Sequence, residues 1–442
     1  MSNPAIHETL EETDRSQPAQ SGIQNLEIVD LAAERTCHFC GLELENVVLD
    51  LGMSPLCESF ITADALDAME TFYPLRVFVC KQCYLMQLPR YESPQNIFKN
   101  YAYFSSFSES WLAHAKAYVE DITKLLQLTE ASQVVEIASN DGYLLQFFVE
   151  MGIPALGIDP AGNVAEAARA RGVDTLVEFF NTGLAERLRS DGLQADLIIG
   201  NNVLAQVPNL NSFVGGIKIL LAPTGVATFE FPNLLRMIES NQFDTIYHEH
   251  FSYFSFSSAE RIFAAHGLVF FDVDELQTHG GSLRIYARHI EDSTRPESAR
   301  VSRMRQHERE IGLDSLEFYK TLQERVESTK RKLLTFLIDA RQSGKRVVAY
   351  GAPGKGNTLL NYCGIRTDLI EYTVDLNPFK QGLFLPGTHI PIYPVERLAE
   401  TVPDYIVILP WNLRDEIADQ LAYTSRWGAE LVVFIPEVEV LN

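Results

Sequence analysis

The sequence lacks any apolar run of the roughly 18 residues that a membrane-spanning helix needs. Positive charge is also scarce, because 36 lysine and arginine residues stand against 59 aspartate and glutamate residues, a formal net charge of −23. This charge opposes binding to nucleic acid and to anionic lipid. We therefore expect no nucleic acid and no membrane among its partners. With 46% apolar and 21% charged residues, the chain should still fold.

The N-terminal stretch is polar and acidic and lacks the apolar segment of a secretory signal. We expect residues 1–25 to be a disordered tail. Cysteine is scarce as well, and its positions are Cys37, Cys40, Cys57, Cys80, Cys83 and Cys363. Four of them form two C-x-x-C pairs, whereas Cys57 is most simply a small buried apolar residue. The paired motifs indicate metal binding in a reducing compartment, so we expect a cytoplasmic protein.

The two C-x-x-C pairs predict a structural zinc site. Each pair places two thiols in one tight turn, and Zn²⁺ prefers four sulfur ligands in closed sites. A redox C-x-x-C is the alternative, but thioredoxin-like motifs adjoin a βαβ pattern and do not come in matched pairs. We therefore expect a zinc-binding domain over residues 26–95, with Cys37, Cys40, Cys80 and Cys83 as ligands.

A chain of 442 residues exceeds the roughly 250–300 residues at which one hydrophobic core stops growing, so two or three domains are expected. An apolar strand at 133–137 runs through a small polar turn into a helix. A second strand ends in Asp159, 23 residues after Glu136, where a carboxylate can accept hydrogen bonds from ribose hydroxyls. These βα units predict a nucleotide-like cofactor.

The turn after the first strand argues against NAD. A dinucleotide fingerprint needs glycines beside the pyrophosphate, whereas this turn offers Ser139, Asn140 and Asp141. An anionic Asp141 would tolerate a sulfonium cation. A helix N-cap is an equally good explanation of that residue.

The segment V-V-E-I-A-S-N-D-G resembles motif I of class I S-adenosylmethionine-dependent methyltransferases. Ala138 and Asn140 stand where that motif has its first two glycines, and Gly142 matches its last one. The resemblance implies that S-adenosylmethionine is bound by Glu136, Ala138, Asn140, Gly142, Asp159 and Asn201.

The segment Y-H-E-H at 247–250 concentrates groups that can move protons. Its histidines are two apart, whereas the zinc motif H-E-x-x-H has them four apart on a helix. In an extended segment His248 and His250 would face one side and Glu249 the other, a constraint that a loop would relax. Histidine is the natural general base near neutral pH, so the cluster predicts acid–base chemistry.

Several motifs in order along residues 35–440 resemble the three-domain, zinc-containing sugar C-methyltransferases, which act on nucleotide-linked 4-keto-deoxyhexoses in deoxysugar biosynthesis. Besides the cysteine pairs they are I-A-S-N-D-G-Y-L-L, N-N-V-L-A-Q-V-P-N-L, F-E-F-P-N-L, I-Y-H-E-H-F-S-Y-F-S, H-G-G-S-L-R and G-A-P-G-K-G-N-T-L-L-N-Y. The resemblance implies an α/β fold with a small N-terminal zinc-binding domain. It also implies a central class I methyltransferase Rossmann-like domain over 96–300 and a C-terminal Rossmann-like domain over 301–442. We expect a monomer with a nucleotide-diphosphate-sugar as substrate.

Loss of a proton beside a ketone gives an enolate, whose carbon can attack the methyl group of a sulfonium. By resemblance His250 is the base, and Glu249, Tyr247 and Tyr101 belong to the catalytic site. The resemblance implies that the substrate is bound by Tyr103, Asn202, Gln206, His248, Lys355 and Asn357. Family members commonly have histidine at the position of Gln206, and glutamine cannot carry a proton, so the identity of the sugar stays open.

Residues 290–312 hold 10 charged residues out of 23 and predict a solvated connection. The strand, glycine turn and helix start that follow predict a second doubly wound domain. Gly351, Gly354 and Gly356 could cradle a phosphate with Lys355 as its counter-charge, and a tight connection explains them equally well.

Two other functions are compatible with the same motifs. One is methyl transfer to oxygen or nitrogen of another small metabolite. The other is a non-catalytic scaffold that contains zinc and a degenerate methyl-donor site.

Overall fold

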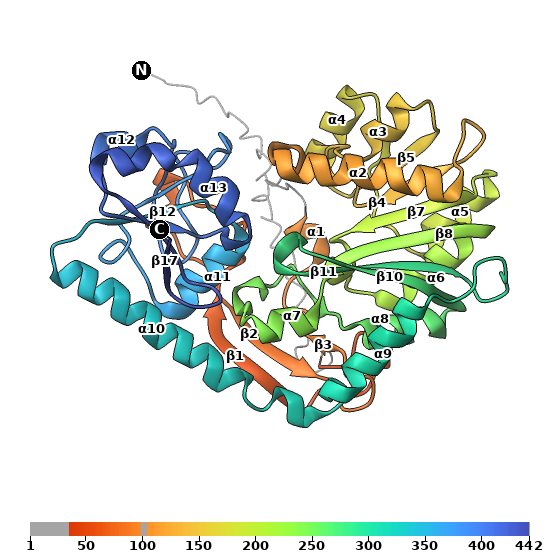
Figure 1. Ribbon diagram of the computed structural model, residues 1–442, viewed down its shortest axis with the longest axis horizontal. Coiled ribbons are helices and arrows are strands. Elements are labelled where there is room, and N and C mark those ends of the chain that lie inside the picture. Colours follow the sequence, from red (N-terminus) through yellow and green to blue (C-terminus); the bar gives the residue numbers. More distant parts are fainter. Residues whose placement is uncertain (1–34, 99–103, 442) are drawn as a thin grey trace, which may run out of the picture.

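The structure is a computed structural model that describes residues 35–98 and 104–441. Within these residues the strands form three sheets, and Figure 1 shows the long β1 and β2 strands beside two larger α/β units. Tyr101 and Tyr103 lie outside the described residues. The predicted α/β fold class is confirmed.

The first sheet is antiparallel and takes strands from two distant parts of the chain. Its order is β1 (Asn46–Ser54), β2 (Tyr73–Val79), β3 (Met86–Gln87) and β9 (Ser252–Tyr253). β3 begins three residues after Cys83 and β9 two residues after His250, and Gln87 pairs with Ser252. The Y-H-E-H segment is thus joined by backbone pairing to the N-terminal sheet, which helix α1 (Pro94–Ile97) follows.

The second sheet is mostly parallel. Its order is β10 (Leu268–Leu276), β11 (Ser282–His289), β8 (Leu221–Pro232), β7 (Ala195–Asn201), β4 (Val134–Ile137), β5 (Ala155–Ile158) and β6 (Asp174–Leu176). Only β11 of these strands runs antiparallel to both of its neighbours. All four residues of β4 are buried, as expected for a parallel strand with both faces covered. The strand order places β4, and with it the motif I turn, in the middle of the five parallel strands.

Helices cover both faces of this sheet. They are α2 (Glu109–Leu126), α3 (Leu145–Glu150), α4 (Gly162–Ala170), α5 (Thr182–Ser190), α6 (Leu210–Leu220) and α8 (Phe256–Ala265). Helix α7 (Leu234–Glu239) instead buries its apolar side chains in the core of the first and third sheets. Val134 packs with α2 and α3, whereas the next residue, Val135, packs with α5 and α6. Alternate residues of one buried strand therefore serve two hydrophobic layers.

The expected solvated connection over 290–312 is wrong for its second half. Ala299–Ile311 form helix α9, which buries Val301 and Met304 in the same core as α8 and β10. The buried carboxylate of Glu308 accepts backbone N–H groups from the first turn of α8. Because few of its residues are apolar, the helix lacks a clear hydrophobic periodicity.

The third sheet is the second doubly wound sheet that the sequence predicts. Its order is β14 (Ile392–Tyr393), β13 (Thr373–Val374), β12 (Val347–Tyr350), β15 (Tyr405–Ile408), β16 (Glu430–Val433) and β17 (Glu439–Leu441). Its helices include α10 (Leu322–Gln342), α11 (Gly354–Cys363), α12 (Arg397–Thr401) and α13 (Arg414–Gln420). In the described part of the chain, no helix has both the length and the hydropathy to cross a membrane.

Two hydrophobic cores join the three sheets. One contains side chains of β1, β2 and the third sheet, and the other contains the cysteine turns and side chains of the second sheet. The segments that follow β4, β5 and β7, and those that follow β12, β13 and β15, line one common pocket. In doubly wound folds, ligands bind at this carboxyl edge of the strands.

Candidate active site

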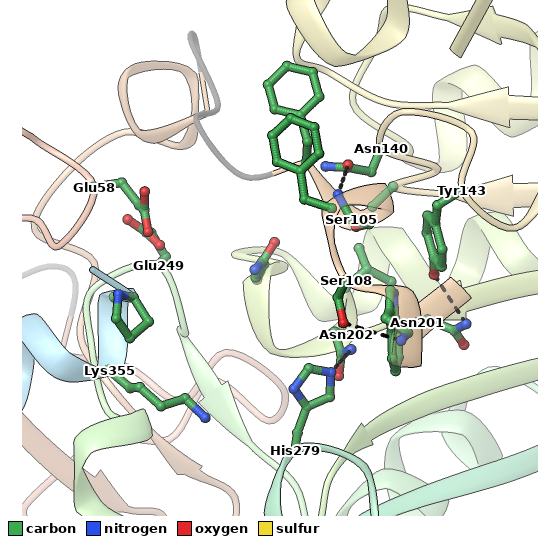
Figure 2. A pocket seen from close by; sticks show the side chains of 18 of the residues that line it. Glu58, Ser105, Ser108, Asn140, Tyr143, Asn201, Asn202, Glu249, His279 and Lys355 are labelled. Carbon is green, nitrogen blue, oxygen red and sulfur yellow. Dashed lines mark hydrogen bonds between the residues drawn. The ribbon is translucent and has the colours of Figure 1, made fainter. Parts of the chain in front are cut away.

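A pocket of about 800 Å³ lies where the three sheets meet (Figure 2). This volume is in the upper part of the range for small-molecule sites, roughly 300–1,000 Å³. Of the predicted site residues, it is lined by Ala138, Asn140, Asp159, Asn201, Asn202, Gln206, Tyr247, Glu249, His250 and Lys355. Residues predicted from separate motifs are therefore brought together.

The turn after β4 has an unusual backbone. Ala138, Asn140 and Gly142 have φ angles of +59°, +48° and +76°, in the left-handed region. A Cβ atom on Gly142 would lie 3.1 Å from Cγ2 of Val173, so both conformation and packing favour glycine there. Strained non-glycine residues cluster at functional sites. Ala138 and Asn140 face the pocket, whereas Gly142 supports the turn from outside it.

Two carboxyl groups lie beside this turn. Asp159 accepts the backbone N–H groups of Asn140 at 3.0 Å and Ala161 at 2.8 Å, and burial raises its pKa to about 6. Glu136 does not line the pocket and is 1% exposed beneath the turn, where burial raises its pKa well above the usual range. Asp159 thus brings to the pocket a carboxyl group at a strand end, which can accept hydrogen bonds from the ribose hydroxyls of S-adenosylmethionine, whereas Glu136 stays behind the turn and is not brought to the pocket. The residues present therefore fit this methyl donor.

Asp141 takes neither of the two roles considered for it. Its side chain is fully buried, and Oδ2 lies 2.8 Å from Nη1 of Arg171. The N-cap residue of α3 is Leu144, so Asp141 does not cap that helix. The neighbouring Asn140 accepts the backbone N–H of Ser105 at 2.9 Å, as Figure 2 shows. The hydroxyl group of Ser106 donates to Oδ2 of Asp141, so Asn140 and Asp141 both hold the segment before α2 against the motif I turn.

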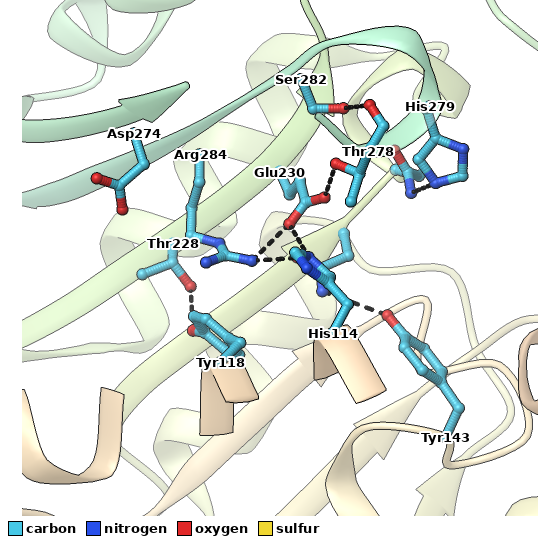
Figure 3. Close-up of polar contacts among 12 residues, drawn as sticks. His114, Tyr118, Tyr143, Thr228, Glu230, Asp274, Thr278, His279, Ser282 and Arg284 are labelled. Carbon is cyan, nitrogen blue, oxygen red and sulfur yellow. Dashed lines mark hydrogen bonds and ion pairs between the residues drawn. The ribbon is translucent and has the colours of Figure 1, made fainter. Parts of the chain in front are cut away.

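A buried network forms the wall next to α2 (Figure 3). Oε2 of Glu230 lies 2.6 Å from Nη2 of Arg284 and 2.9 Å from Nε2 of His114, and Oε1 accepts the hydroxyl hydrogen of Thr278 at 2.7 Å. Burial alone would raise the pKa of Glu230, but His114 and Arg284 lower it to about 2. Since His114 and Thr278 line the pocket, this network fixes two parts of its wall.

The Y-H-E-H segment is a tight turn, not an extended strand. The backbone N–H of His250 donates to the carbonyl oxygen of Tyr247 at 2.9 Å, and the two ring centroids are 4.0 Å apart. Nδ1 of His250 lies 3.0 Å from the carbonyl oxygen of Thr245. A carbonyl only accepts, so Nδ1 carries the hydrogen and Nε2 keeps its lone pair. Burial lowers the pKa of His250 to about 4, which keeps the ring neutral.

His248 points away from the pocket into the N-terminal sheet. Its Nε2 lies 3.1 Å from the carbonyl oxygen of Pro74, and its ring centroid is 5.7 Å from that of Tyr73. The turn sends the two histidines apart, so the segment is the loop of the two cases considered, and His248 and His250 do not share a side. Nothing in this placement supports the prediction that His248 binds substrate.

The C-terminal side of the pocket carries a lysine. Nζ of Lys355 donates to Oδ1 of Asn412 at 2.7 Å and lies 4.6 Å from the ring centroid of Trp411. Burial lowers the pKa of Lys355. Asn357 is buried inside α11, does not line the pocket, and accepts a hydrogen bond from Asn361 at 3.2 Å. The structure therefore brings Lys355 but not Asn357 to the pocket.

The glycines beside Lys355 have a packing explanation. A Cβ atom on Gly351 would lie 2.6 Å from Cδ of Pro410, and one on Gly354 would lie 2.7 Å from Sγ of Cys57. Gly351 thus packs against the segment after β15 of its own sheet and Gly354 against the segment after β1, and both close approaches require small residues. This favours the tight connection over a phosphate cradle as the reason for the glycines.

Several pocket residues are not identified from the sequence. The H-G-G-S motif supplies one of them, His279, whose Nε2 lies 2.9 Å from Nδ2 of Asn202. Both residues have left-handed backbones, with φ of +53° and +55°. Further pocket residues without a predicted ligand role are Glu58, Trp111, His114 and Asp375. The positive φ at His279 follows from the adjacent glycines of its loop, but spacing alone does not show which wall it joins.

The four paired cysteines form one cluster, as predicted. Their sulfur atoms all lie within 4.8 Å of one another, with 3.4 Å between Cys37 and Cys83 and 3.5 Å between Cys40 and Cys80. Zn–S bonds of about 2.3 Å in a tetrahedron place sulfurs about 3.8 Å apart, so the cluster fits Zn²⁺. Nε2 of Gln87 lies 3.3 Å from Sγ of Cys37, a donor of the kind that supports a metal-bound thiolate.

Solved structures are only distantly similar to this chain. An S-adenosylmethionine-dependent methyltransferase from Anabaena variabilis matches with 14% identity and a TM-score of 0.33, over 39% of this chain and 84% of its own. Magnesium protoporphyrin IX methyltransferase from Synechocystis, solved with S-adenosylhomocysteine, matches with 12% identity and a TM-score of 0.32, over 40% of this chain and 80% of its own.

Sequence comparisons are more informative. A zinc binding domain matches residues 37–98, a methyltransferase domain matches 111–272, and a C-methyltransferase C-terminal domain matches 277–436. C-methyltransferase NovU from Streptomyces niveus is 35% identical over 408 residues, which cover 92% of this chain and 96% of the relative. Together with the cysteine cluster and the motif I pocket, these matches show that the chain belongs to the S-adenosylmethionine-dependent C-methyltransferases that carry an N-terminal zinc-binding domain.

Proposed function

We propose that this enzyme methylates a ring carbon of a nucleotide-linked 4-keto-deoxyhexose, in the biosynthesis of a deoxysugar for a natural product such as an antibiotic. The observation that carries the proposal is the position of His250. This neutral histidine has a fixed ring orientation. It lines the same pocket as the second-sheet residues expected to bind the methyl donor and as Lys355 of the third sheet.

His250 is suited to take the proton beside the keto group. Its Nε2 accepts the proton, the C–H electron pair becomes the enolate, and the carbanionic carbon then bonds to the methyl carbon. Bound S-adenosylmethionine would supply that electrophilic methyl group, and its sulfur–methyl bond would break to leave S-adenosylhomocysteine. Tyr247 and Asn202, which line the same pocket, are placed to contact the oxygens of the sugar. Holding donor and acceptor in one pocket supplies much of the rate.

The nucleotide part of the substrate fits the C-terminal side. Against a net charge of −23, a diphosphate needs a local cation, and Lys355 provides one in the pocket wall. Asp375, at the end of β13, occupies the position from which a carboxylate can accept ribose hydroxyls in doubly wound sheets. The C-terminal domain, predicted over 301–442, would thus bind the nucleotide.

Carbon is favoured over oxygen or nitrogen as the methyl acceptor. The relative NovU is named a C-methyltransferase, and C-methyltransferase domains match this chain. The family assignment also makes a non-catalytic scaffold the weaker alternative.

The proposal is tested by hydrogen exchange without methyl donor. The enzyme is incubated in deuterated water with nucleoside-diphosphate-linked 4-keto-deoxyhexoses, and NMR follows loss of the proton beside the ketone. We expect exchange that depends on His250 and is lost in His250→Asn. The matched control is His307→Asn, an exposed histidine of α9 outside the pocket. Exchange that is absent, or unchanged in His250→Asn, would contradict the enolate route.

A further inference from the structure

Four polar side chains from three parts of the chain meet at one wall of the pocket. Cys57 and Glu58 follow β1, Glu249 belongs to the Y-H-E-H turn, and Lys380 follows β13. Figure 2 shows Glu58 and Glu249 next to each other across the pocket from Tyr143. Glu58, Glu249 and Lys380 line the pocket. Of these four residues only Glu249 is predicted from the sequence to belong to the catalytic site, and the proposed chemistry gives none of them a role.

The group is held together by direct contacts. The thiol of Cys57 donates to Oε1 of Glu249 at 3.3 Å. Nζ of Lys380 lies 3.5 Å from Oε2 of Glu58 and donates to the carbonyl oxygen of Ala352 at 2.9 Å. Cys57, Glu249 and Lys380 are 2%, 4% and 5% exposed. Water therefore does little to screen the charges of this cluster.

The charges in the cluster do not balance if both glutamates are ionised. Two carboxyl groups face one ammonium group, and Asp375, which is also close to Glu58, adds a further negative charge. Asp375 is itself held by the backbone N–H groups of Ala352 and Asn377. Two buried carboxylates that share one site cannot both ionise easily, so one of them keeps a proton.

The position of Lys380 decides which carboxyl group stays ionised. The ammonium group lies against Glu58, so that carboxylate has the nearest counter-charge. Burial, and then the charge of Glu58, raise the pKa of Glu249, with the Cys57 thiol and Lys380 opposing the rise. Burial also raises the pKa of Glu58, and Lys380 opposes this. Glu249 is therefore the group that retains the proton.

We propose that the carboxyl groups of Glu58 and Glu249 carry one proton in total, and that this proton is on Glu249. Glu58 and Lys380 are then positioning residues that keep Glu249 a hydrogen-bond donor. The protonated Glu249 presents an O–H group in the pocket that the neutral base His250 also lines. Resting on the proposed function, this O–H donates a hydrogen bond to the keto oxygen as it becomes an enolate oxygen. No proton needs to leave Glu249 for this stabilisation.

The proposal is tested first without substrate. Full-length enzyme is labelled with carbon-13 in glutamate side-chain carboxyls, and its NMR titration is followed against pH. The Glu249 signal is the one missing in Glu249→Gln. We expect it to titrate well above the ordinary glutamate value of about 4.3. Titration at the ordinary value would overturn the proposal.

Two variants separate this account from a structural role, because they shift the titration in opposite directions. Glu58→Gln removes the neighbouring negative charge and should lower the pH at which Glu249 titrates by roughly one unit or more. Lys380→Met removes the cation and should raise the pH of the higher of the two titration steps of Glu58 and Glu249. Lys380→Arg keeps the charge and should leave it near wild type. Shifts in the same direction for Glu58→Gln and Lys380→Met would overturn the proposal.

Turnover then gives a second, separate readout. Activity should fall with rising pH as Glu249 loses its proton, and this alkaline limb should move down in Glu58→Gln and up in Lys380→Met. If neither substitution moves the alkaline limb of the pH–activity profile, Glu249 is not the hydrogen-bond donor in turnover. If no nucleotide-linked keto-sugar is turned over, the proposed function fails, but the titration of the ligand-free enzyme still decides whether the proton pair exists.

Discussion

Nδ1 of His250 lies 3.0 Å from the carbonyl oxygen of Thr245, and this contact fixes which ring nitrogen can act as a base. Thr245 ends the short turn Phe243–Thr245. In the same turn Asp244 accepts a hydrogen bond at 2.7 Å from the indole N–H of Trp411, which follows β15. The orientation of the base is therefore coupled to the contact between the second and third sheets.

Removal of the base should affect turnover more than donor binding. His250→Ala should lower turnover by about 10²- to 10⁴-fold, the usual loss for a general base. The residue lies in the Y-H-E-H turn and not in motif I, so affinity for S-adenosylhomocysteine, measured by isothermal titration, should change little. His307→Ala, on the exposed face of α9, is the matched control. Near-wild-type turnover in His250→Ala would remove it from this role.

Loss of zinc should disturb the active site through the backbone. β3 follows Cys83 closely and pairs with β9, which follows His250, so a loosened cysteine turn releases the catalytic turn. We expect a chelator or Cys80→Ser to lower the melting temperature and abolish turnover, with about one equivalent of zinc lost by metal analysis. Cys363→Ala, a buried cysteine outside the cluster, should keep its zinc. Full activity after complete zinc removal would contradict this coupling.

Acid should destabilise the fold through buried neutral histidines. Burial lowers the pKa of His248, His250 and His279 to about 4 from 6.5. Between these values the unfolded chain binds more protons than the folded one, so stability falls as pH falls from 6.5 toward 4. Denaturant unfolding should show a loss on the order of 1–2 kcal/mol per histidine by about pH 5. The dependence of the unfolding free energy on pH should be weaker in His248→Gln. An unchanged dependence would show that this histidine does not contribute.

The motif I glycine should be harder to replace than a surface glycine with the same backbone. Gly142 and Gly152 have φ of +76° and +73°, but only Gly142 has neighbours that a Cβ atom would crowd. Gly152→Ala should cost about 1–2 kcal/mol from backbone strain alone. Gly142→Ala should cost about 1–3 kcal/mol more from overpacking and weaken S-adenosylhomocysteine binding. Equal losses in denaturant unfolding would contradict the packing argument.

The sequence predicts a feature of the site well when the residue pattern that indicates it lies within one short segment. The cysteine pairs and the strand at β4 are examples, because ligand spacing and a buried apolar run are local properties. The helix Ala299–Ile311 is missed, since Arg300 and Arg305 form ion pairs with Asp272 and Glu260 that hydrophobic periodicity does not register.

Contacts between distant segments are not predictable in this way. Cys57 meets Glu249 across 192 positions of sequence, and nothing in the spacing of either residue indicates that contact. The sequence leaves open whether residues 247–250 are extended or a loop, and the backbone hydrogen bond from His250 to Tyr247, which decides this, is not visible in the residue pattern. Which side chains share a pocket is decided by such long-range pairing.

The central claim is that a methyl group is attached to carbon of a nucleotide-linked keto-sugar. It is tested most directly by reacting the enzyme with S-adenosylmethionine carrying a carbon-13 methyl group and a nucleoside-diphosphate-linked 4-keto-deoxyhexose. Two-dimensional NMR of the product then shows the atom that bears the label. The account predicts a methyl carbon coupled to a ring carbon beside the ketone. A labelled methyl on oxygen or nitrogen, or no labelled sugar at all, would contradict it.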